Sequence, residues 1–338
     1  MQRSYQVAIV GATGAVGQEL LSILEARKFP VAWLSLLASK RSAGQILSFA
    51  GKELPVRELT DGSFAGVDFA LFSVSSSISR AFGPLAAREG AVVIDDSSAF
   101  RMDPTVPLVV TEVNPHVLKR HQGIIAHPNC STIPLVMVLK PLHQRARVRR
   151  VVVATYQSVS GAGGRAMNEL EQQTRALVAG QALLVDVFPH QIAFNCLPHI
   201  DAFGELGYTG EEWKIVRETH KILEDDSIRM STTTVRVPVY RCHSEAVNIE
   251  TEQRLTRQEV RELLATAPGV AVIDDPEKNE YPMPITVAGR DEVFVGRIRE
   301  DPSHDRAINL WLVSDNLRKG AALNMVQIME LLCVGNEP

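Results

Sequence analysis

Cysteine is scarce in this sequence, and its distribution excludes two common uses of the residue. Only four of the 338 residues are cysteine, and no two of them form a CxxC pair. Their spacing fits neither a zinc site nor a disulfide framework. We therefore expect no metal centre, and free thiols in a reducing cytoplasm. The four residues are Cys130, Cys196, Cys242 and Cys333.

Long apolar runs and an excess of basic residues are also missing. No stretch approaches the roughly 18 apolar residues that a membrane-spanning helix needs. The first residues lead directly into a strand pattern, without the regions of a signal peptide, so a cytoplasmic protein with no membrane partner is expected. The net charge of −4 argues against a nucleic-acid partner. One basic run, residues 145–150, is interpreted as a solvated loop.

The first third of the chain alternates strand and helix patterns. A length of 338 residues suits about two domains, and the 45% of apolar residues is ordinary for a globular core. Residues 15–27 repeat apolar side chains at intervals of three and four, which predicts an amphipathic helix. The alternation predicts a Rossmann-like, doubly wound parallel α/β sheet. Its expected strands are residues 6–10, 33–38, 69–73, 92–95 and 123–126.

Near residue 150 the pattern changes to longer, more β-branched strands at residues 151–161, 232–240, 244–252 and 306–315. These strands predict a second, α+β domain with a mixed or antiparallel sheet. Helices are expected at residues 166–179, 211–223, 257–266 and 319–333, and the second of them begins with the capping-box spacing Thr209 to Glu212. The last helix is expected to return to the first domain. The predicted domains are residues 1–130 with 316–338, and residues 131–315.

A glycine-rich loop, GATGAVG, joins the first predicted strand to the first predicted helix. Glycine permits the tight turn and the close approach of a phosphate to the backbone, while the helix N-terminus supplies free N–H groups. The spacing is GxxGxxG rather than GxGxxG, but its strand–loop–helix context predicts a dinucleotide site. A turn without a ligand is the alternative. The predicted cofactor-binding residues are Gly11, Thr13, Gly14, Ala15, Val16 and Gly17.

The end of the second predicted strand indicates which dinucleotide binds. An NAD site usually has an acidic residue there, which binds the ribose hydroxyls. Residues 34–42 contain no acid and end in Ser39, Lys40, Arg41 and Ser42. Such hydroxyls and cations suit a 2′-phosphate, so NADP(H) is the predicted cofactor, with Arg41 and Ser42 among its ligands. A solvated Lys-Arg turn is the alternative.

Cys130 is the candidate nucleophile, because it follows a predicted strand and a Pro-Asn turn and precedes a predicted helix. The partial positive charge of a helix N-terminus favours the thiolate and lowers the thiol pKa. The alternative is a buried cysteine that acts as a small apolar side chain. Among nine histidines, His243 is the best candidate for the partner base, since it lies between two strand patterns beside small and polar residues.

Eight segments of the chain form one ordered set: GATGAVG, SSAFRM, PNCST, YQSVSGAG, AFNCLPHID, RVPV followed by HSEAVNIE, FVGRIRED and WLVSDNLRKGAA. Together they resemble the aspartate-semialdehyde dehydrogenase family over nearly the whole chain. The related N-acetyl-glutamyl-phosphate reductases would be expected to have glycine before the cysteine and tyrosine after it. This chain has Asn129 and Ser131 at those positions.

The resemblance implies a reaction in which L-aspartyl phosphate and NADPH give aspartate semialdehyde, NADP and phosphate. By similarity, Cys130 attacks the acyl carbon and forms a thioester, which hydride then reduces. His243 is implied as the general acid/base for the thiol and the oxyanion. The family also leads us to expect a homodimer built on the sheet of the second domain.

The resemblance further implies how substrate and cofactor are held. A planar guanidinium suits bidentate binding of the substrate carboxylate, the role implied for Arg236. Arg101 and Lys214 would bind phosphate, Gln157 would orient the substrate carbonyl, and Glu211 is a further substrate-binding candidate. Without the family, Lys214 would be a solvated helix charge. The implied cofactor contacts in the second half of the chain are Ser160, Gly161 and Asn316.

Three residues depart from the family's usual pattern. Asp96 stands where asparagine is common, His127 where relatives often carry a second cysteine, and Cys242 where a small residue is usual. An ionised Asp96 that faced the phosphate pocket would repel substrate. Two alternatives therefore stay open: a paralogue with little turnover, and another acyl-phosphate or acyl-CoA reductase on the same scaffold.

Overall fold

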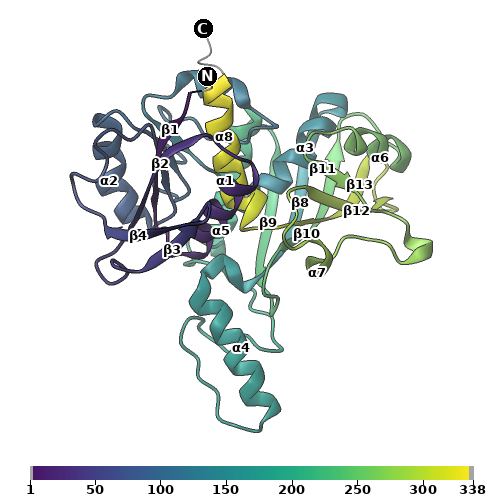
Figure 1. The fold of residues 1–338 in the computed structure, drawn as a ribbon. Coiled ribbons are helices and arrows are strands. Elements are labelled where there is room, and N and C mark those ends of the chain that lie inside the picture. Colours follow the sequence, from purple (N-terminus) through teal and green to yellow (C-terminus); the bar gives the residue numbers. More distant parts are fainter. Residues whose placement is uncertain (1–2, 335–338) are drawn as a thin grey trace. The chain divides into compact units, whose positions relative to one another are not determined.

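The computed structural model describes residues 3–334, which belong to two compact units. The first unit is Met1–Asn129 with Ala321–Pro338, and the second is Cys130–Gly320 (Figure 1). The sequence-based boundaries were 130/131 and 315/316. Residues 1, 2 and 335–338 of the first predicted domain lie outside the described residues.

A seven-stranded sheet in the order β3-β4-β2-β1-β5-β6-β7 forms the centre of the first unit. All of its described pairings are parallel except β3 with β4. The helices are α1 (Ala15–Ala26), α2 (Ser76–Arg88) and α8 (Leu323–Val334). The strands are β1 (Tyr5–Val10), β2 (Val31–Ala38), β3 (Ile46–Phe49), β4 (Lys52–Glu58), β5 (Phe69–Phe72), β6 (Val92–Asp95) and β7 (Ile124–Ala126).

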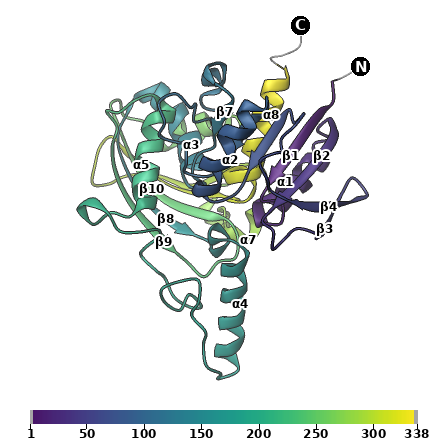
Figure 2. The same cartoon turned by 90° about the vertical axis from the view of Figure 1, so that its left-hand side faces the viewer.

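The alternation of side chains along β1 explains why helices cover both faces of this sheet. Val7 and Ile9 belong to an apolar cluster that includes residues of α1 and α8. Ala8 and Val10 point to the opposite face and belong to a second cluster. A strand buried on both faces is typical of a doubly wound sheet. Figure 2 shows α8 beside α1, with which it is in contact.

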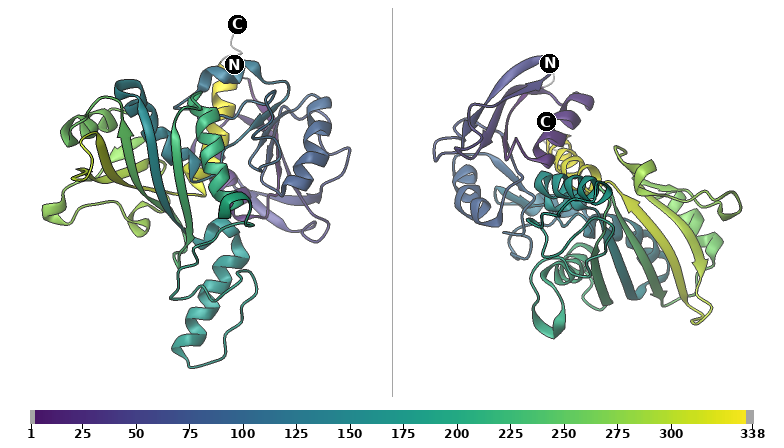
Figure 3. Two further views of the ribbon diagram at one scale, coloured as in Figure 1. Left: turned by 180° about the vertical axis from the view of Figure 1, so that it is seen from behind. Right: turned by 90° about the horizontal axis from the view of Figure 1, so that it is seen from below.

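The second unit contains a six-stranded mixed sheet in the order β11-β12-β13-β10-β8-β9 (Figure 3). The β8–β9 and β11–β12 pairs are parallel and the other three are antiparallel. The strands are β8 (Val148–Gln157), β9 (Arg229–Arg236), β10 (His243–Thr251), β11 (Val270–Val272), β12 (Val293–Glu300) and β13 (Ala307–Ser314). The two sheets confirm the predicted fold class.

Helices cover one face of the second sheet. α3 (Thr132–Ala146) contacts β8, β10 and β13, and α5 (Gly210–Leu223) contacts β9. α4 (Gly164–Val178) extends away from the sheet in Figures 1 and 2. The remaining helices include α6 (Arg257–Ala265) and α7 (Pro284–Val287). No helix among residues 3–334 has the length and apolar character needed to cross a membrane.

Candidate active site

The glycine loop of the first unit is fixed by close backbone contacts. Gly11 has φ +91°, and a Cβ there would lie 2.2 Å from the carbonyl oxygen of Ser73. A Cβ on Gly17 would lie 2.3 Å from the carbonyl oxygen of Gly11. Gly14 is the exposed N-cap residue of α1, and no side chain of this fully described helix caps its first turn. Thr13 precedes α1, and Ala15 and Val16 begin it, so their backbone N–H groups are suited to an anion.

Arg41 and Ser42, the predicted ligands of the 2′-phosphate of the cofactor, lie in the turn after β2. The backbone N–H of Ser42 donates to the carbonyl oxygen of Ser39 at 2.8 Å, which closes the turn. Arg41 is exposed and Ser42 is half-buried. Both side chains therefore remain accessible to a ligand at the carboxyl end of β2.

Two of the three unusual residues lie against each other in the first unit. The Nδ1 atom of the buried His127 is 3.0 Å from Oδ1 of Asp96. Arg101 is buried, and its Nη2 donates to the backbone carbonyl of Asp96 at 2.7 Å. The Asp96 carboxylate is thus directed to an imidazole, while the backbone carbonyl of Asp96 accepts a hydrogen bond from Arg101.

Cys130 lies immediately before α3 in the second unit and is half-buried. A Cβ on Gly320 would lie 3.1 Å from the Cβ of Cys130, so glycine allows this close approach. Burial lowers the pKa of Arg236. The negative charges of Glu211 and Cys130 offset part of this effect. A cationic guanidinium near the thiol favours the thiolate.

Arg236 and His243 lie on different strands. Arg236 ends β9 and His243 begins β10, and β8 runs between these two strands. The two residues therefore belong to strands that β8 separates in the sheet. The chain leaves the sheet after Arg236, since Val239 and Tyr240 accept backbone hydrogen bonds from the loop at Val159 and Ser160 instead.

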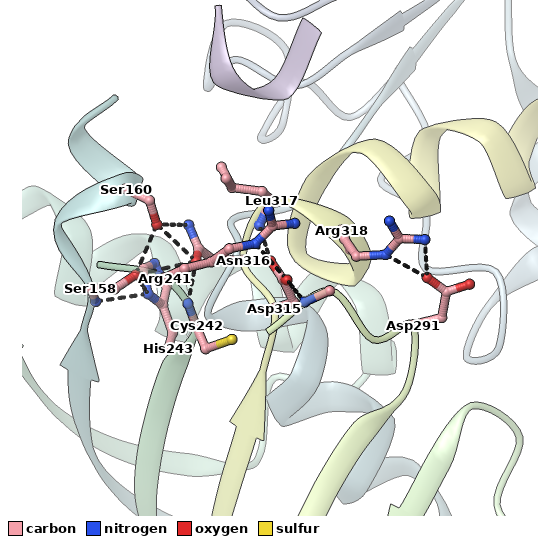
Figure 4. Close-up of polar contacts among 11 residues, drawn as sticks. Ser158, Ser160, Arg241, Cys242, His243, Asp291, Asp315, Asn316, Leu317 and Arg318 are labelled. Atoms are coloured by element: carbon pink, nitrogen blue, oxygen red, sulfur yellow. Dashed lines mark hydrogen bonds and ion pairs between the residues drawn. The ribbon is translucent and has the colours of Figure 1, made fainter. Parts of the chain in front are cut away.

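A hydrogen bond from the backbone fixes the tautomer of His243. Its Nδ1 lies 3.0 Å from the backbone N–H of Ser158 and 3.1 Å from the hydroxyl oxygen of the same residue (Figure 4). Because a backbone N–H can only donate, Nδ1 accepts, and the neutral ring carries its proton on Nε2. Burial, and then the charge of Arg236, lower the pKa of His243 to about 3. At neutral pH the residue therefore presents a neutral N–H group.

Asn316 connects the histidine loop to the loop after β8. Its Oδ1 accepts hydrogen bonds from the backbone N–H of Cys242 at 3.0 Å and from the Ser160 hydroxyl at 3.1 Å (Figure 4). The Ser158 hydroxyl also donates to it, at 3.2 Å. Cys242 has φ +74°, and burial raises the pKa of its thiol. The third unusual residue is therefore an inert buried thiol in a left-handed conformation.

A chain of polar contacts joins Gln157 to α5. The Nε2 of Gln157 donates to Oε1 of Glu211 at 3.2 Å, and Oε2 of Glu211 lies 3.3 Å from Nζ of Lys214. Lys214 is also 2.8 Å from the Asp201 carboxylate. Burial raises the pKa of Asp201, but the Lys214 hydrogen bond and charge reverse this and leave the pKa lowered.

Gly161 lies next to the side chains of both Arg236 and His243. A Cβ added to it would lie 2.9 Å from Nη1 of Arg236 and 3.1 Å from Nε2 of His243. The guanidinium of Arg236 also donates from Nη1 to the carbonyl of Ser158 at 2.7 Å. Because Gly161 has no side chain, the guanidinium of Arg236 and the imidazole of His243 can both lie close to its Cα.

The predicted site residues thus fall into two groups. The second unit brings together Cys130 with Arg236, and Gln157 with Glu211 and Lys214, and it links His243, Ser160, Gly161 and Asn316 through the contacts above. The first unit holds the glycine loop, Arg41, Ser42 and Arg101. Sequence reasoning missed Ser158 and Asp201, although both lie in the quoted segments YQSVSGAG and AFNCLPHID. Residues 3–334 contain no group of three His, Cys, Asp or Glu side chains suited to a metal ion.

The chain is similar to known proteins over nearly its whole length. It matches the family models "Semialdehyde dehydrogenase, NAD binding domain" over residues 6–121 and "Semialdehyde dehydrogenase, dimerisation domain" over residues 139–319. The aspartate-semialdehyde dehydrogenase of Aquifex aeolicus is 56% identical over 332 residues, which cover 97% of this chain and 98% of that protein.

Solved structures agree with these sequence matches. A crystal structure of aspartate semialdehyde dehydrogenase II from Vibrio cholerae, complexed with ASA, has a TM-score of 0.97 and 45% identity, and covers 99% of this chain and 100% of its own. The aspartate semialdehyde dehydrogenase of Candida albicans with NADP has a TM-score of 0.75 and 25% identity, and covers 98% of each chain.

Proposed function

The chain belongs to the aspartate-semialdehyde dehydrogenase family, and from this premise we propose that it reduces L-aspartyl 4-phosphate to L-aspartate 4-semialdehyde with NADPH, releasing phosphate. The observation that carries the proposal is the grouping, in one unit, of a half-buried thiol, a cationic Arg236 and a neutral His243. Such a reaction serves the biosynthesis of lysine, methionine, threonine and diaminopimelate.

Cys130 carries the acyl group. Its thiolate attacks the acyl carbon, a carbon–sulfur bond forms, and the bond from that carbon to the phosphate oxygen breaks, so that phosphate leaves. Two features support the thiolate: its position at the N-terminus of α3 and the neighbouring charge of Arg236. The thioester divides one difficult step into two easier ones.

His243 acts first as a hydrogen-bond donor. Its Nε2 carries the proton, because Nδ1 accepts the N–H of Ser158. A neutral N–H of this kind stabilises the oxyanion that develops on the acyl oxygen, and it can pass its proton to that oxygen. Ser158 and Asn316 hold the ring and its loop in place, which makes them positioning residues.

NADPH, when bound, would supply the hydride that reduces the thioester. The bond from the former acyl carbon to the sulfur of Cys130 then breaks, which releases the aldehyde and restores the thiolate. Gly11 and Gly17 let the loop pack closely against neighbouring backbone, and the free N–H groups at the start of α1 suit a dinucleotide phosphate. The accessible Arg41 and Ser42, and the lack of an acid in the turn that they share, suit a 2′-phosphate and favour NADP(H) over NAD. The NADP in the Candida albicans structure is consistent with this choice. Ser160, Gly161 and Asn316 are proposed to contact the cofactor in the second unit.

The substrate's anionic groups are assigned to three cations. Arg236 is buried and presents a planar guanidinium, which suits the substrate carboxylate. Lys214 and Arg101 are proposed to bind phosphate, and Gln157 to orient the acyl carbonyl. Glu211 holds both Gln157 and Lys214. A homodimer formed through the second unit follows from the matching dimerisation-domain model.

The test is an assay of reduced nicotinamide formed from aspartate semialdehyde, phosphate and NADP. Cys130→Ala should lower turnover by at least about a thousandfold, because the nucleophile is lost. Cys196→Ala is the matched control, since Cys196 is an exposed free cysteine, and it should keep wild-type turnover. NAD should support a slower reaction than NADP.

Other outcomes would contradict particular parts of the proposal. Turnover without phosphate would exclude the phosphorylating reaction, and full activity of Cys130→Ala would exclude the thioester. A folded, NADP-binding protein without turnover would be a non-catalytic paralogue. Turnover with N-acetyl-glutamate semialdehyde instead would identify another acyl-phosphate reductase.

A further inference from the structure

The buried face of the second sheet carries two consecutive rows of polar side chains. Strand pairing places Glu245 of β10 opposite Thr155 of β8, and Thr155 opposite Thr234 of β9. Because residues two apart on a strand share a face, this row lies directly beside the row that the reaction uses. The members of that first row are Arg236, Gln157, His243 and Ser314.

Glu245 has no role in the reaction above, and its surroundings are unusual for a carboxyl group. Its side chain is almost fully buried, and neither carboxyl oxygen has a hydrogen-bond partner among the described residues. Burial raises the pKa of Glu245 well above its ordinary value. The group is therefore an uncharged acid at neutral pH, which can donate one hydrogen bond and accept others.

A hydroxyl in the same row also lacks a partner. Oγ1 of Thr234 is buried and has no hydrogen-bond partner within residues 3–334. Most buried polar groups in proteins are paired with protein atoms or with ordered water. Several such atoms near one another are typical of a buried water site.

The two rows are connected through Gln157. Its Nε2 donates to Oγ1 of Thr155 at 3.4 Å and to Oε1 of Glu211 at 3.2 Å. Directly opposite residues in an antiparallel pair have Cβ atoms about 5 Å apart, so the side chains of Glu245 and Thr155 lie next to each other. A Thr155 hydroxyl that donates its hydrogen to an ordered water keeps a lone pair directed to the Gln157 amide.

We propose that Glu245 is an uncharged positioning residue which, through ordered water shared with Thr155 and Thr234, holds the amide of Gln157 in the orientation that the substrate requires. The part that concerns substrate rests on the proposed function, because it assigns Gln157 to the acyl carbonyl. The uncharged carboxyl and its water do not depend on that assignment.

Few ionisable groups surround the Glu245 row, and none forms an ion pair with it among the described residues. On the strands beside it these groups are His243 and Arg236, both in the first row. α3 carries its ionisable residues in its second half, at Lys140, His143 and Arg145. The nearest part of α5 contributes Glu211 and Glu212, whose oxygens accept from Gln157 and from the backbone of Thr234.

The first experiment measures unfolding of wild type and Glu245→Gln between about pH 5 and about pH 8. The pKa of Glu245 is raised in the folded state, so its contribution to stability is full below the ordinary glutamate pKa and is lost as the pH rises. The unfolding constant of wild type should therefore rise relative to that of the variant by up to about tenfold per pH unit. Glu250→Gln, on the same strand but half-exposed, should show no such trend.

Parallel stability curves for wild type and Glu245→Gln would overturn the uncharged carboxyl, whether or not the enzyme turns over aspartate semialdehyde. A crystal structure at high resolution should show water between Glu245 and Thr155. A direct contact that excludes water, or an empty space there, would overturn the shared water site.

The second experiment tests positioning with a double-mutant cycle. Glu245→Leu should lower kcat by about tenfold, since a small displacement of a substrate-orienting group is costly. The same change made in a Gln157→Ala protein should cause almost no further loss, because the group that it positions is gone. An equal loss in both backgrounds would overturn the link to Gln157. Glu250→Leu is the control and should leave kcat unchanged; if Glu245→Leu does not fold, the pH series decides.

Discussion

At the scale of single residues, the environment of His243 determines the part that it plays. An imidazole that accepts a backbone hydrogen bond at Nδ1 can only donate from Nε2 while it is neutral. Its low pKa, about 3, means that protonating it is unfavourable at neutral pH. In the proposed reaction the thiol would therefore be activated mainly by α3 and Arg236, and His243 would stabilise and protonate the oxyanion.

Gly161 provides the sharpest test of this arrangement. A methyl group there would meet Nη1 of Arg236 at 2.9 Å and Nε2 of His243 at 3.1 Å, so both side chains must shift. We expect Gly161→Ala to lower kcat by about tenfold to a hundredfold while the protein stays folded. Steady-state kinetics and a circular-dichroism melt measure the two effects.

The matched control for this change is Gly164→Ala. Gly164 begins α4, and a Cβ added to it meets no atom within 4 Å in the described chain. Its kinetic constants should equal those of wild type. Equal activity of both alanine variants would show that His243 and Arg236 do not need their present positions.

The residue scale also marks the limit of sequence reasoning. Asp96 and His127 are far apart in the sequence and were each noted as unusual, but only the fold places their side chains 3.0 Å apart. Asp201 was missed because its role comes from contact with Lys214 on α5, which no local pattern encodes. By contrast, Cys130 could be selected from the sequence, since a strand, a turn and a helix start are all local features.

At the scale of elements, the N-terminus of α5 sets the position of Glu211 and Lys214. Thr209 and Glu212 form a complete capping box, as their spacing predicts. Thr209→Ala should therefore cost about 1 kcal/mol of stability and also raise the KM for phosphate, because the first two turns of α5 carry Glu211 and Lys214. Chemical denaturation and initial rates at varied phosphate measure these effects.

α6 offers the control for that prediction, since Thr256 and Glu259 form a second capping box on a helix without predicted site residues. Thr256→Ala should cost a similar free energy and leave the KM for phosphate unchanged. If both variants raised this KM equally, general destabilisation would explain the effect, and the specific role of the α5 cap would be wrong.

The strands of the first sheet show which elements a sequence can predict. Five of the six strands with parallel pairings, several of them continuous apolar runs, were predicted to within about two residues. The hairpin β3–β4 was missed. Its turn has positive φ at Ala50 (+49°) and Gly51 (+73°), as in a type I′ turn, but the residues are Ala-Gly rather than the usual Asn-Gly. Tertiary contacts stabilise a hairpin with so weak a local signal: β4 pairs with β2, and Leu47, Phe49 and Leu54 pack against the apolar core.

At the scale of the whole molecule, the first unit is built from both ends of the chain. Residues of α8 lie in the same apolar cluster as β1 and α1, and Asn324 donates to the backbone of Val109 at 2.9 Å. The sequence predicted a helix over residues 319–333 that returns to the first domain, but its pattern does not identify the residues that it contacts there. The partner of a buried helix is a tertiary property.

This arrangement predicts that the last helix is needed for cofactor binding. Ile328 is fully buried in the cluster, so Ile328→Ala should cost about 2 to 5 kcal/mol of unfolding free energy. The loss should fall on the first unit: hydrogen exchange should speed up in β1 more than in β10, and NADPH affinity should fall. Leu331→Ala, on the same helix but 40% exposed, should do neither. Faster exchange in β10 instead, or equal effects of the two variants, would contradict the assignment of α8 to the nucleotide-binding core.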